Sequence, residues 1–377
     1  MKEINDIISA YRTAVNDNIR MTLATVVKVE GSSYRQPGAR MLVTEDGRLT
    51  GAISGGCLEG DALRKALLAI HQQQNKLITY DTNEEGSSEL GVQLGCNGIV
   101  HILFEHIDSD DPFNPIALLE QLRVSRKESV LVTLFSLEQR KQQIGTSILK
   151  QEDVEIFKPT IAGYHLLLSA DMLLAKQKRQ NFLKSFDYQG QVQEALIEYI
   201  SSPISLIIAG AGNDAKPMVE AASLLGWETT ILDGRATHAL QQRFPKAQRV
   251  LLASPDQAIE QLQIDSHTVF VLMTHNYKYD LSLLQYLVKT ATPYIGVLGP
   301  KTKLQRMLDD VSTAGIILSE TQKICIYGPM GLDIGAETSE EIAFSTICEI
   351  KAVLSNRKAG FLKNLTTKIH ETTPIIT

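Results

Sequence analysis

Two cysteines lie in glycine-rich segments, where a thiol has room to meet a bulky ligand. Cys57 stands in residues 54–60, SGGCLEG, between a predicted strand and a predicted helix. The dipole at a helix start favours the thiolate, which is the form that binds soft metals and reacts with sulfur. Cys96, in LGCNG, ends a long polar segment. We therefore predict a soft-metal or sulfur site at Cys57 and Cys96, with Gly55 and Gly56 leaving space for the ligand.

The other two cysteines, Cys325 and Cys348, lie in apolar segments, and we expect both to be small core residues. A buried structural role is also the alternative for Cys57 and Cys96. With four cysteines and no C-x-x-C pair, the chain lacks the usual ligand spacing of a structural zinc site or an iron–sulfur cluster.

A glycine pattern of the dinucleotide-binding type lies in the second half of the chain. Residues 210–215, GAGNDA, follow an apolar strand and open a predicted helix. Glycines let the backbone approach a phosphate, and the amides of a helix start bind it. Asp214 adds a negative charge that opposes a pyrophosphate, so a Rossmann fold used only as a scaffold is the alternative. The residues expected to bind a nucleotide, NAD(P) among the options, are Gly210, Gly212, Asn213 and Asp233, the last at a ribose-binding position.

Three polar residues near the ends of later predicted strands are candidates for catalysis: His275, Asp333 and Glu337. Open α/β sheets bind their ligands at the carboxyl ends of the strands. No catalytic residue is assigned firmly, because a capping box from Thr338 to Glu341 explains the neighbouring pattern more simply.

The predicted elements divide the chain into an N-terminal mixed α+β domain at 1–190, a doubly wound parallel sheet of the Rossmann type at 200–360, and a tail at 361–377. In the second domain strands and helices alternate, which is typical of a parallel sheet. We expect its strands at 205–209, 229–232, 249–253, 268–273, 294–298 and 323–327. Before it, we expect a linker or surface hairpin at 176–184 and a helix at 191–199.

Composition excludes several classes of function. The net charge of −6 over 377 residues argues against a nucleic-acid binder, which normally carries a basic face. We find neither an apolar run near the ~18 residues of a membrane span nor a signal peptide, so we expect a cytoplasmic protein without a membrane partner.

Several motifs together resemble the xanthine dehydrogenase accessory proteins of the XdhC/CoxI type. The first half carries GSSYRQPGARMLV at 31–43 and SGGCLE at 54–59, with Tyr34 where that family usually has proline. The second half carries DGR at 233–235, MTH at 273–275, YIGVLG at 294–299 and GLDIGAETSEEIA at 331–343. The matches span residues 20–105 and 205–360.

The resemblance implies an accessory factor, rather than an enzyme, that binds the sulfurated molybdenum cofactor (molybdopterin) and helps to insert it into a xanthine dehydrogenase-type molybdenum hydroxylase. It implies Cys57 as a ligand of molybdenum or its sulfur, and Arg40, from the first motif, among the cofactor-binding residues. The implied partners are the apo hydroxylase, a cysteine desulfurase and a second copy of the chain. An NAD(P)-dependent oxidoreductase that uses the Rossmann domain, with His275 and Asp333, is the competing hypothesis.

Overall fold

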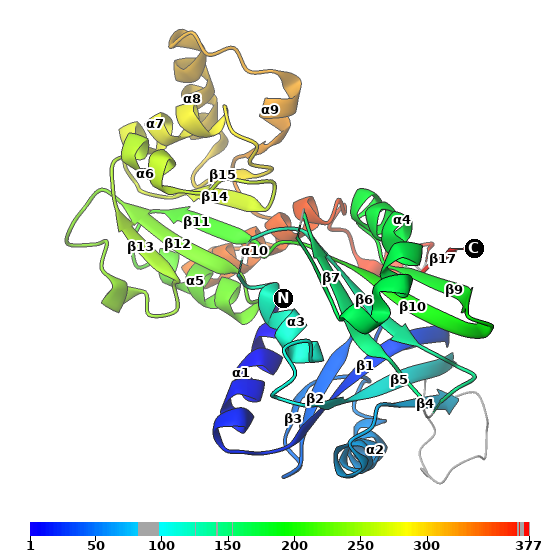
Figure 1. Cartoon of the computed structure of the whole chain (residues 1–377). Helices are drawn as coiled ribbons and strands as arrows, with labels where there is room; N and C mark the ends of the chain where they lie inside the picture. Colours follow the sequence, from blue (N-terminus) through cyan, green and yellow to red (C-terminus); the bar gives the residue numbers. More distant parts are fainter. Residues whose placement is uncertain are drawn as a thin grey trace. The chain divides into compact units, whose positions relative to one another are not determined.

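The computed structural model describes residues 1–81, 98–124, 126–140, 142–152, 154–367, 369 and 373–376. The chain divides into two compact units (Figure 1). Unit 1 comprises Met1–Ser202 and His370–Thr377, and unit 2 comprises Pro203–Ile369.

The first sheet of unit 1 is antiparallel and five-stranded, in the order β3-β2-β1-β5-β4. Its strands are β1 (Met21–Gly31), β2 (Arg40–Thr44), β3 (Leu49–Gly51), β4 (Lys76–Asp81) and β5 (Gly98–Ile107). Helix α2 (Glu59–Gln72) packs on one face through Ala62, Ala66 and Ala69, whose small side chains let it lie close to the strands. This packing fixes the segment between β3 and α2, which contains Cys57.

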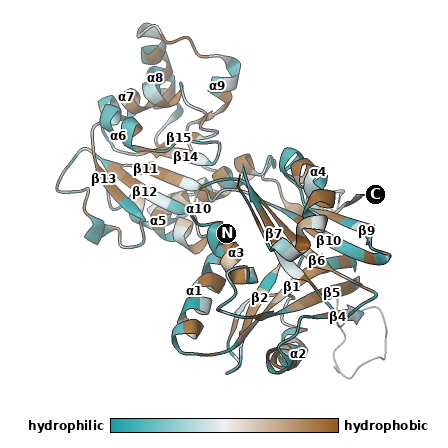
Figure 2. Ribbon diagram, in the orientation of Figure 1, coloured by the Kyte–Doolittle hydropathy of each residue, from teal (hydrophilic) through white to brown (hydrophobic). Residues whose placement is uncertain are grey.

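The second sheet of unit 1 has the order β17-β9-β10-β6-β7-β8. Its strands are β6 (Ser129–Phe135), β7 (Gly145–Gln151), β8 (Val154–Phe157), β9 (Phe182–Tyr188), β10 (Gln191–Ile200) and β17 (Ile375–Ile376). It packs against the first sheet through an apolar layer that includes Leu103 and Leu196, and apolar residues predominate along its inner strands (Figure 2).

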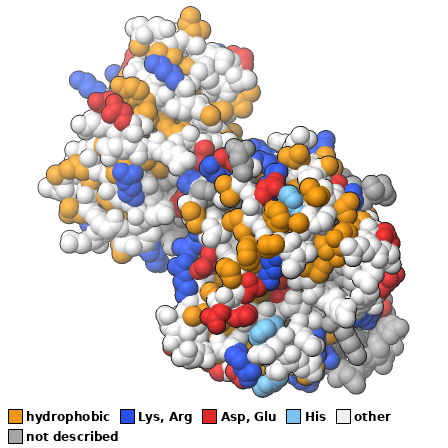
Figure 3. Space-filling model, in the orientation of Figure 1, with side chains coloured by type: hydrophobic (Ala, Val, Ile, Leu, Met, Phe, Trp, Pro, Cys, Tyr) orange, Lys and Arg blue, Asp and Glu red, His pale blue; other side chains and the backbone are white. Residues whose placement is uncertain are grey.

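The other helical segments described in unit 1 are α1 (Lys2–Asn16), α3 (Pro115–Gln121), a short 3₁₀ turn at Pro159–Ile161 and α4 (Ala162–Lys178). Helices α1 and α3 share one apolar cluster with both sheets, while α4 covers the second sheet through Leu168 and Met172. Helix α4 also leaves Leu166 and Leu173 exposed, and apolar side chains gather on this face of unit 1 (Figure 3).

The helix predicted at 191–199 is wrong, because this segment forms β10. Strand β10 pairs with β9 on one side and β6 on the other. Its Leu196 is buried between the two sheets, and Ala195 and Ile197 on its other face are buried under α4. The hairpin from β9 to β10 turns at Gln189 and Gly190, which both have positive φ (56° and 79°), as a two-residue type I′ turn requires. The segment 176–184, predicted as a linker or hairpin, contains the end of α4 and the start of β9.

Unit 2 confirms the predicted doubly wound parallel sheet. Its six strands have the order β13-β12-β11-β14-β15-β16 and all pair in parallel. In chain order this is 3-2-1-4-5-6, the Rossmann arrangement, whose topological switch point lies between β11 and β14. The strands are β11 (Ser205–Ala209), β12 (Glu228–Asp233), β13 (Arg249–Leu252), β14 (Thr268–Leu272), β15 (Ile295–Val297) and β16 (Ile326–Tyr327).

Helices cover both faces of this sheet (Figure 1). Helices α5 (Ala215–Leu224) and α10 (Ser339–Leu354) pack on one face, and α6 (Pro255–Gln261), α7 (Tyr277–Leu287) and α8 (Lys301–Thr313) pack on the other. The last predicted strand, at 323–327, is only partly correct, because α9 (Glu320–Ile324) takes up its first residues. The remaining short elements are 3₁₀ turns at Gln241–Arg243 and Leu362–Asn364.

Candidate functional site

The segment that carries Cys57 is held by hydrogen bonds within itself. The Ser54 hydroxyl accepts from the amides of Gly56 and Leu58, both at 3.1 Å, and donates to the Glu59 carboxylate. That carboxylate also accepts from the Ser54 amide at 3.0 Å. Ser54 and Glu59, the first residue of α2, thus hold the two ends of the loop that contains Cys57.

The surface around Cys57 is open on its glycine side. Gly55 and Gly56 are exposed, and a Cβ added at Gly56 would meet no atom within 4 Å. A Cβ at Gly55 would lie 3.4 Å from the ring of Tyr34, so this ring lies against the loop while remaining 71% exposed. The Arg35 Nε donates to the Ala52 carbonyl at 3.0 Å and ties the two glycine-rich segments together. Sequence reasoning missed Tyr34 as a member of this surface, although it stood out as a departure from the family pattern.

The cysteines differ in their surroundings. Cys57 is half-buried, and its inner side packs on the apolar cluster beneath α2. Cys96 lies outside the described residues. The expected core position is wrong for Cys348, which is exposed on α10, and only partly met by Cys325, which is half-buried at the end of α9 and donates its Sγ–H to the Thr321 carbonyl at 3.3 Å.

Arg40 lies in the core of unit 1 rather than on its surface. Its guanidinium is 2% exposed and pairs with Glu198 through two hydrogen bonds, and it also donates to the Gly38 carbonyl at 2.8 Å. Burial alone would lower the pKa of Arg40, but the charge and hydrogen bonds of Glu198 raise it above its ordinary value. These contacts join β2 to β10 through the two terminal nitrogens of Arg40, while its buried Nε has no hydrogen-bond partner. They give Arg40 a structural role.

The glycine loop of unit 2 lies at the switch point. A Cβ at Gly210 would collide with the carbonyl of Met273, so only glycine allows the ends of β11 and β14 to approach this closely. Asn213 is exposed and its side chain accepts from Arg243 at 3.1 Å. The same guanidinium donates to the Ala211 carbonyl at 2.8 Å, so Arg243 braces the loop.

Asp233 is already bound by donors of this chain. Its carboxylate accepts from the Ala211 amide at 2.8 Å and from the backbone and guanidinium of Arg235 at 2.6–2.9 Å. Burial would raise the pKa of Asp233, but these hydrogen bonds outweigh it and the pKa lies below the usual range. Asp233 thus holds the glycine loop in place, and its contact with a ribose stays a prediction.

The three candidate catalytic residues of unit 2 lie on two separate segments of the chain. His275 lies at the switch point, where its Nε2 is 2.7 Å from the Asp214 carboxylate. Asp333 and Glu337 are exposed in the segment that leads to α10. The capping box expected there is confirmed, because Thr338 and Glu341 exchange hydrogen bonds at the start of α10.

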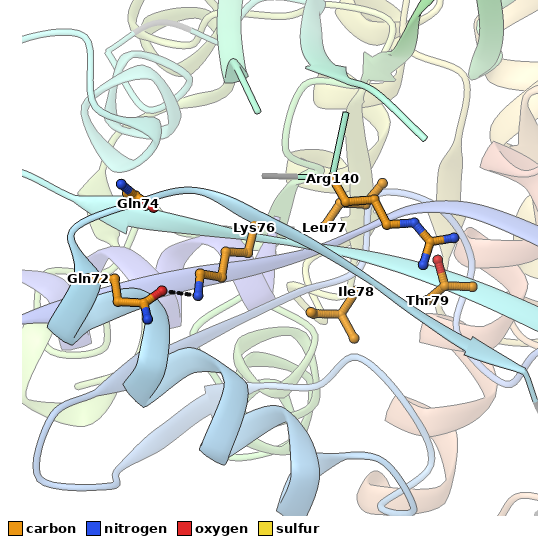
Figure 4. A pocket seen from close by; sticks show the side chains of 7 residues that line it. All are labelled: Gln72, Gln74, Lys76, Leu77, Ile78, Thr79 and Arg140. Atoms are coloured by element: carbon orange, nitrogen blue, oxygen red, sulfur yellow. Dashed lines mark hydrogen bonds between the residues drawn. The ribbon is translucent and has the colours of Figure 1, made fainter. Parts of the chain in front are cut away.

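Each unit also contains a cavity. A cavity of about 350 Å³ in unit 2 is lined by His275, Tyr277 and Lys303, among others. The Lys303 ammonium donates to the buried Asp280 carboxylate and to the Leu298 carbonyl, each at 2.9 Å, so its charge is balanced. A larger cavity of about 720 Å³ lies along β4 in unit 1, with Lys76 and Arg140 among the side chains that line it (Figure 4). Among the described residues, this cavity is lined by Gln72, Gln74, Lys76, Leu77, Ile78, Thr79 and Arg140, and none of these is a predicted site residue.

Neither a metal cluster nor a membrane helix is found in the part of the chain that the structure describes. No group of three or more His, Cys, Asp or Glu side chains is placed to hold a metal ion among those residues. No helix in the same residues is long and apolar enough to cross a membrane.

Comparisons with known proteins agree on one family for both units. Residues 206–350 match the XdhC Rossmann domain, and residues 14–81 match the XdhC and CoxI family. A probable xanthine dehydrogenase subunit of Bacillus subtilis is 31% identical over 89% of this chain and 94% of its own length. A molybdenum cofactor insertion chaperone of Escherichia coli, PaoD, is 25% identical over 88% of this chain and 82% of its own. Among solved structures, a xanthine dehydrogenase from Bacillus halodurans is similar with a TM-score of 0.72 at 26% identity, over 94% of this chain and 97% of that one.

Proposed function

The chain belongs to the XdhC and CoxI family, and from this we propose that it is an accessory factor that binds the sulfurated molybdenum cofactor and helps to insert it into a molybdenum hydroxylase of the xanthine dehydrogenase type. The name of the Escherichia coli relative, a molybdenum cofactor insertion chaperone, supports this role. The partners proposed are the apo hydroxylase, which receives the cofactor, and a cysteine desulfurase, which supplies the sulfur.

The residues of unit 1 fit this cofactor. Its pterin already supplies sulfur ligands to the metal, so a carrier has to offer few ligands of its own, and a thiolate is a suitable one. Cys57 supplies one thiol on a preformed loop with open space at Gly56, and this is the observation that carries the proposal. The bound cofactor would supply the metal centre that the client enzyme needs.

The parts of the Cys57 loop have different tasks in this proposal. Cys57 contacts the metal or its sulfur, while Gly55 and Gly56 let the cofactor approach the backbone. Ser54 and Glu59 hold the loop in shape before the ligand arrives, which limits the conformational entropy lost on binding. Arg40 is not part of this site, because its guanidinium is buried against Glu198.

We propose separately that the loop of unit 2 with Gly210, Gly212 and Asn213 binds a nucleotide-like phosphate, and that Asp233 holds this loop in shape. An NAD(P)-dependent oxidoreductase is not proposed, because Asp233 is occupied by Arg235 and Ala211 rather than free to bind a ribose.

The test is the cofactor content of the full chain purified from a molybdenum-replete host. We expect the wild type to carry molybdenum and pterin, measured by elemental analysis and by pterin fluorescence after oxidation. Cys57→Ala should lose both, since it removes the thiol and leaves the Ser54 hydrogen bonds in place. Cys348→Ala is the matched control, because it removes an exposed thiol from α10.

A thermal melt separates loss of the site from loss of the fold. Equal cofactor content in Cys57→Ala and the wild type, at equal thermal stability, would contradict the assignment of Cys57. Cys57→Ser, which keeps the size of the side chain, is the second variant if the alanine variant does not fold.

A further inference from the structure

The side chain of Asp214 does not cap the helix that it precedes, unlike most aspartates at a helix start. Asp214 is the N-cap residue of α5, where an acid normally accepts from the amides of the first turn. Its carboxylate makes no such hydrogen bond. It turns back over the glycine loop instead, so that a Cβ at Gly212 would collide with the Asp214 Oδ1.

The Asp214 carboxylate lies where the phosphate of a bound dinucleotide lies in this type of fold. In the dinucleotide fingerprint, the second glycine lets the backbone approach the pyrophosphate, and here that glycine is Gly212. The amides at the start of α5 lack a side-chain cap from Asp214. The loop therefore has a phosphate-binding geometry with an anion of the chain lying against its second glycine.

A residue from another loop holds the carboxylate in this place. The His275 Nε2 lies 2.7 Å from the Asp214 Oδ2, so a hydrogen bond joins the segments that follow β11 and β14. His275 has φ of +57°, a backbone conformation that is uncommon for a residue other than glycine. The contact spans the switch point, where ligands of this fold enter.

The hydrogen bond to Asp233 and, to a lesser extent, the charge of Asp214 raise the pKa of Arg235, so this cation offsets only part of the Asp214 charge. The Arg235 guanidinium is bound to Asp233, and the Arg243 guanidinium is bound to Ala211 and Asn213. An incoming phosphate would therefore meet a carboxylate at the position where the fold usually offers only backbone amides.

We infer that Asp214 and His275 form a latch that closes the phosphate position of the Rossmann loop with a carboxylate of the chain itself. In the latched state unit 2 excludes dinucleotides, and a phosphate binds only after Asp214 leaves Gly212. The inference deepens the phosphate site proposed for this loop and does not depend on the molybdenum site of unit 1.

The experiment measures binding of NAD⁺ and ADP to the full chain by isothermal titration calorimetry at one fixed pH. Asp214→Ala should bind at least one of the two roughly ten-fold or more tightly than the wild type, because the variant removes a like charge from the phosphate position. His275→Ala should give a smaller gain, since the carboxylate is released but its charge remains. Glu260→Ala is the control, because it removes an exposed acid from α6 in the same unit.

The stability of α5 should not suffer, because Asp214 makes no capping bond to lose, and a thermal melt checks this. Equal affinities of Asp214→Ala and the wild type would overturn the latch, and so would the absence of binding by a folded Asp214→Ala. Both outcomes leave the cofactor assay on Cys57 unaffected, so failure of the latch and failure of the accessory role are distinguishable.

Discussion

Replacing Glu198 with glutamine should destabilise unit 1 more than any single surface change. Glutamine has the size of glutamate, which matters because the Glu198 side chain lies close against Gly38 and no larger side chain would fit. The variant therefore changes only the charge that faces Arg40. The side chains of Arg40 and Glu198 are only 2% and 5% exposed, so water cannot replace the lost partner. The Gly38 carbonyl is the other acceptor that the guanidinium keeps.

The magnitude follows from the burial of the pair. Breaking a buried ion pair by removing one partner typically costs about 3–5 kcal/mol, and here Arg40 loses its hydrogen-bonded counter-charge while the weaker attraction of Glu105 and Glu3 remains. For a unit of this size each kcal/mol moves the melting temperature by about 2–4 °C, so the expected drop is roughly 6–20 °C. The double variant Arg40→Met with Glu198→Leu should recover most of the loss, because two apolar side chains need no partner.

The assay uses the single tryptophan of the chain. Trp227 packs against the core of unit 2, so its fluorescence follows the unfolding of that unit, whereas far-ultraviolet circular dichroism follows both units. Glu198→Gln should lower the circular dichroism transition and leave the fluorescence transition in place. An unchanged circular dichroism transition, or a double variant less stable than the single one, would refute the reasoning.

Two further changes test the interior of each unit. Burial raises the pKa of Glu105, although the hydrogen bonds from Thr146 oppose this shift. The stability that protonated Glu105 contributes is therefore complete below the ordinary glutamate pKa. This contribution is lost as the pH rises through the raised pKa. Glu105→Gln should therefore melt at a higher temperature than the wild type at about pH 8 and show no such advantage at about pH 4, as followed by circular dichroism. A stability advantage of the variant that grew as the pH fell would contradict this prediction. Glu349→Ala removes the acceptor of the buried Tyr294 hydroxyl (2.6 Å) and of the Gly331 amide (2.8 Å), and should lower the unfolding free energy of unit 2 by about 1–3 kcal/mol in urea monitored by tryptophan fluorescence. An unchanged midpoint and slope would show that these bonds carry no net stability.

The Rossmann half was predictable because its signals are local. Apolar runs such as 205–209 and 268–272 alternate with helical segments, and glycine at 210 and 212 marks the turn between them. The segment 191–199 failed because its burial is decided by strands from elsewhere. Its apolar residues fit a short helix as well as a strand, and only the pairing with β6 and β9 selects the strand. The turn at Gln189 and Gly190 was the one local signal that could have found it.

In the candidate site, too, only the features set by residues close together in the chain could be predicted. The position of Cys57 between a strand and a helix follows from residues close to it in the chain, and it was predicted. Partners far away in the chain were not: Arg40 and Glu198 are 158 residues apart, and Asp214 and His275 are 61 apart. A single sequence carries no signal for such pairs, so the buried role of Arg40 and the contact across the switch point required the structure.

The order in which a ribosome makes this chain has a consequence for the second sheet of unit 1. Strand β17 pairs with β9 in that sheet, yet all of unit 2 separates the two in the sequence. During synthesis β9 therefore waits with one edge unpaired while Pro203–Ile369 is translated and folds. An unpaired edge is a template for strands of other chains, so the nascent chain is exposed to aggregation at this edge until β17 has been made.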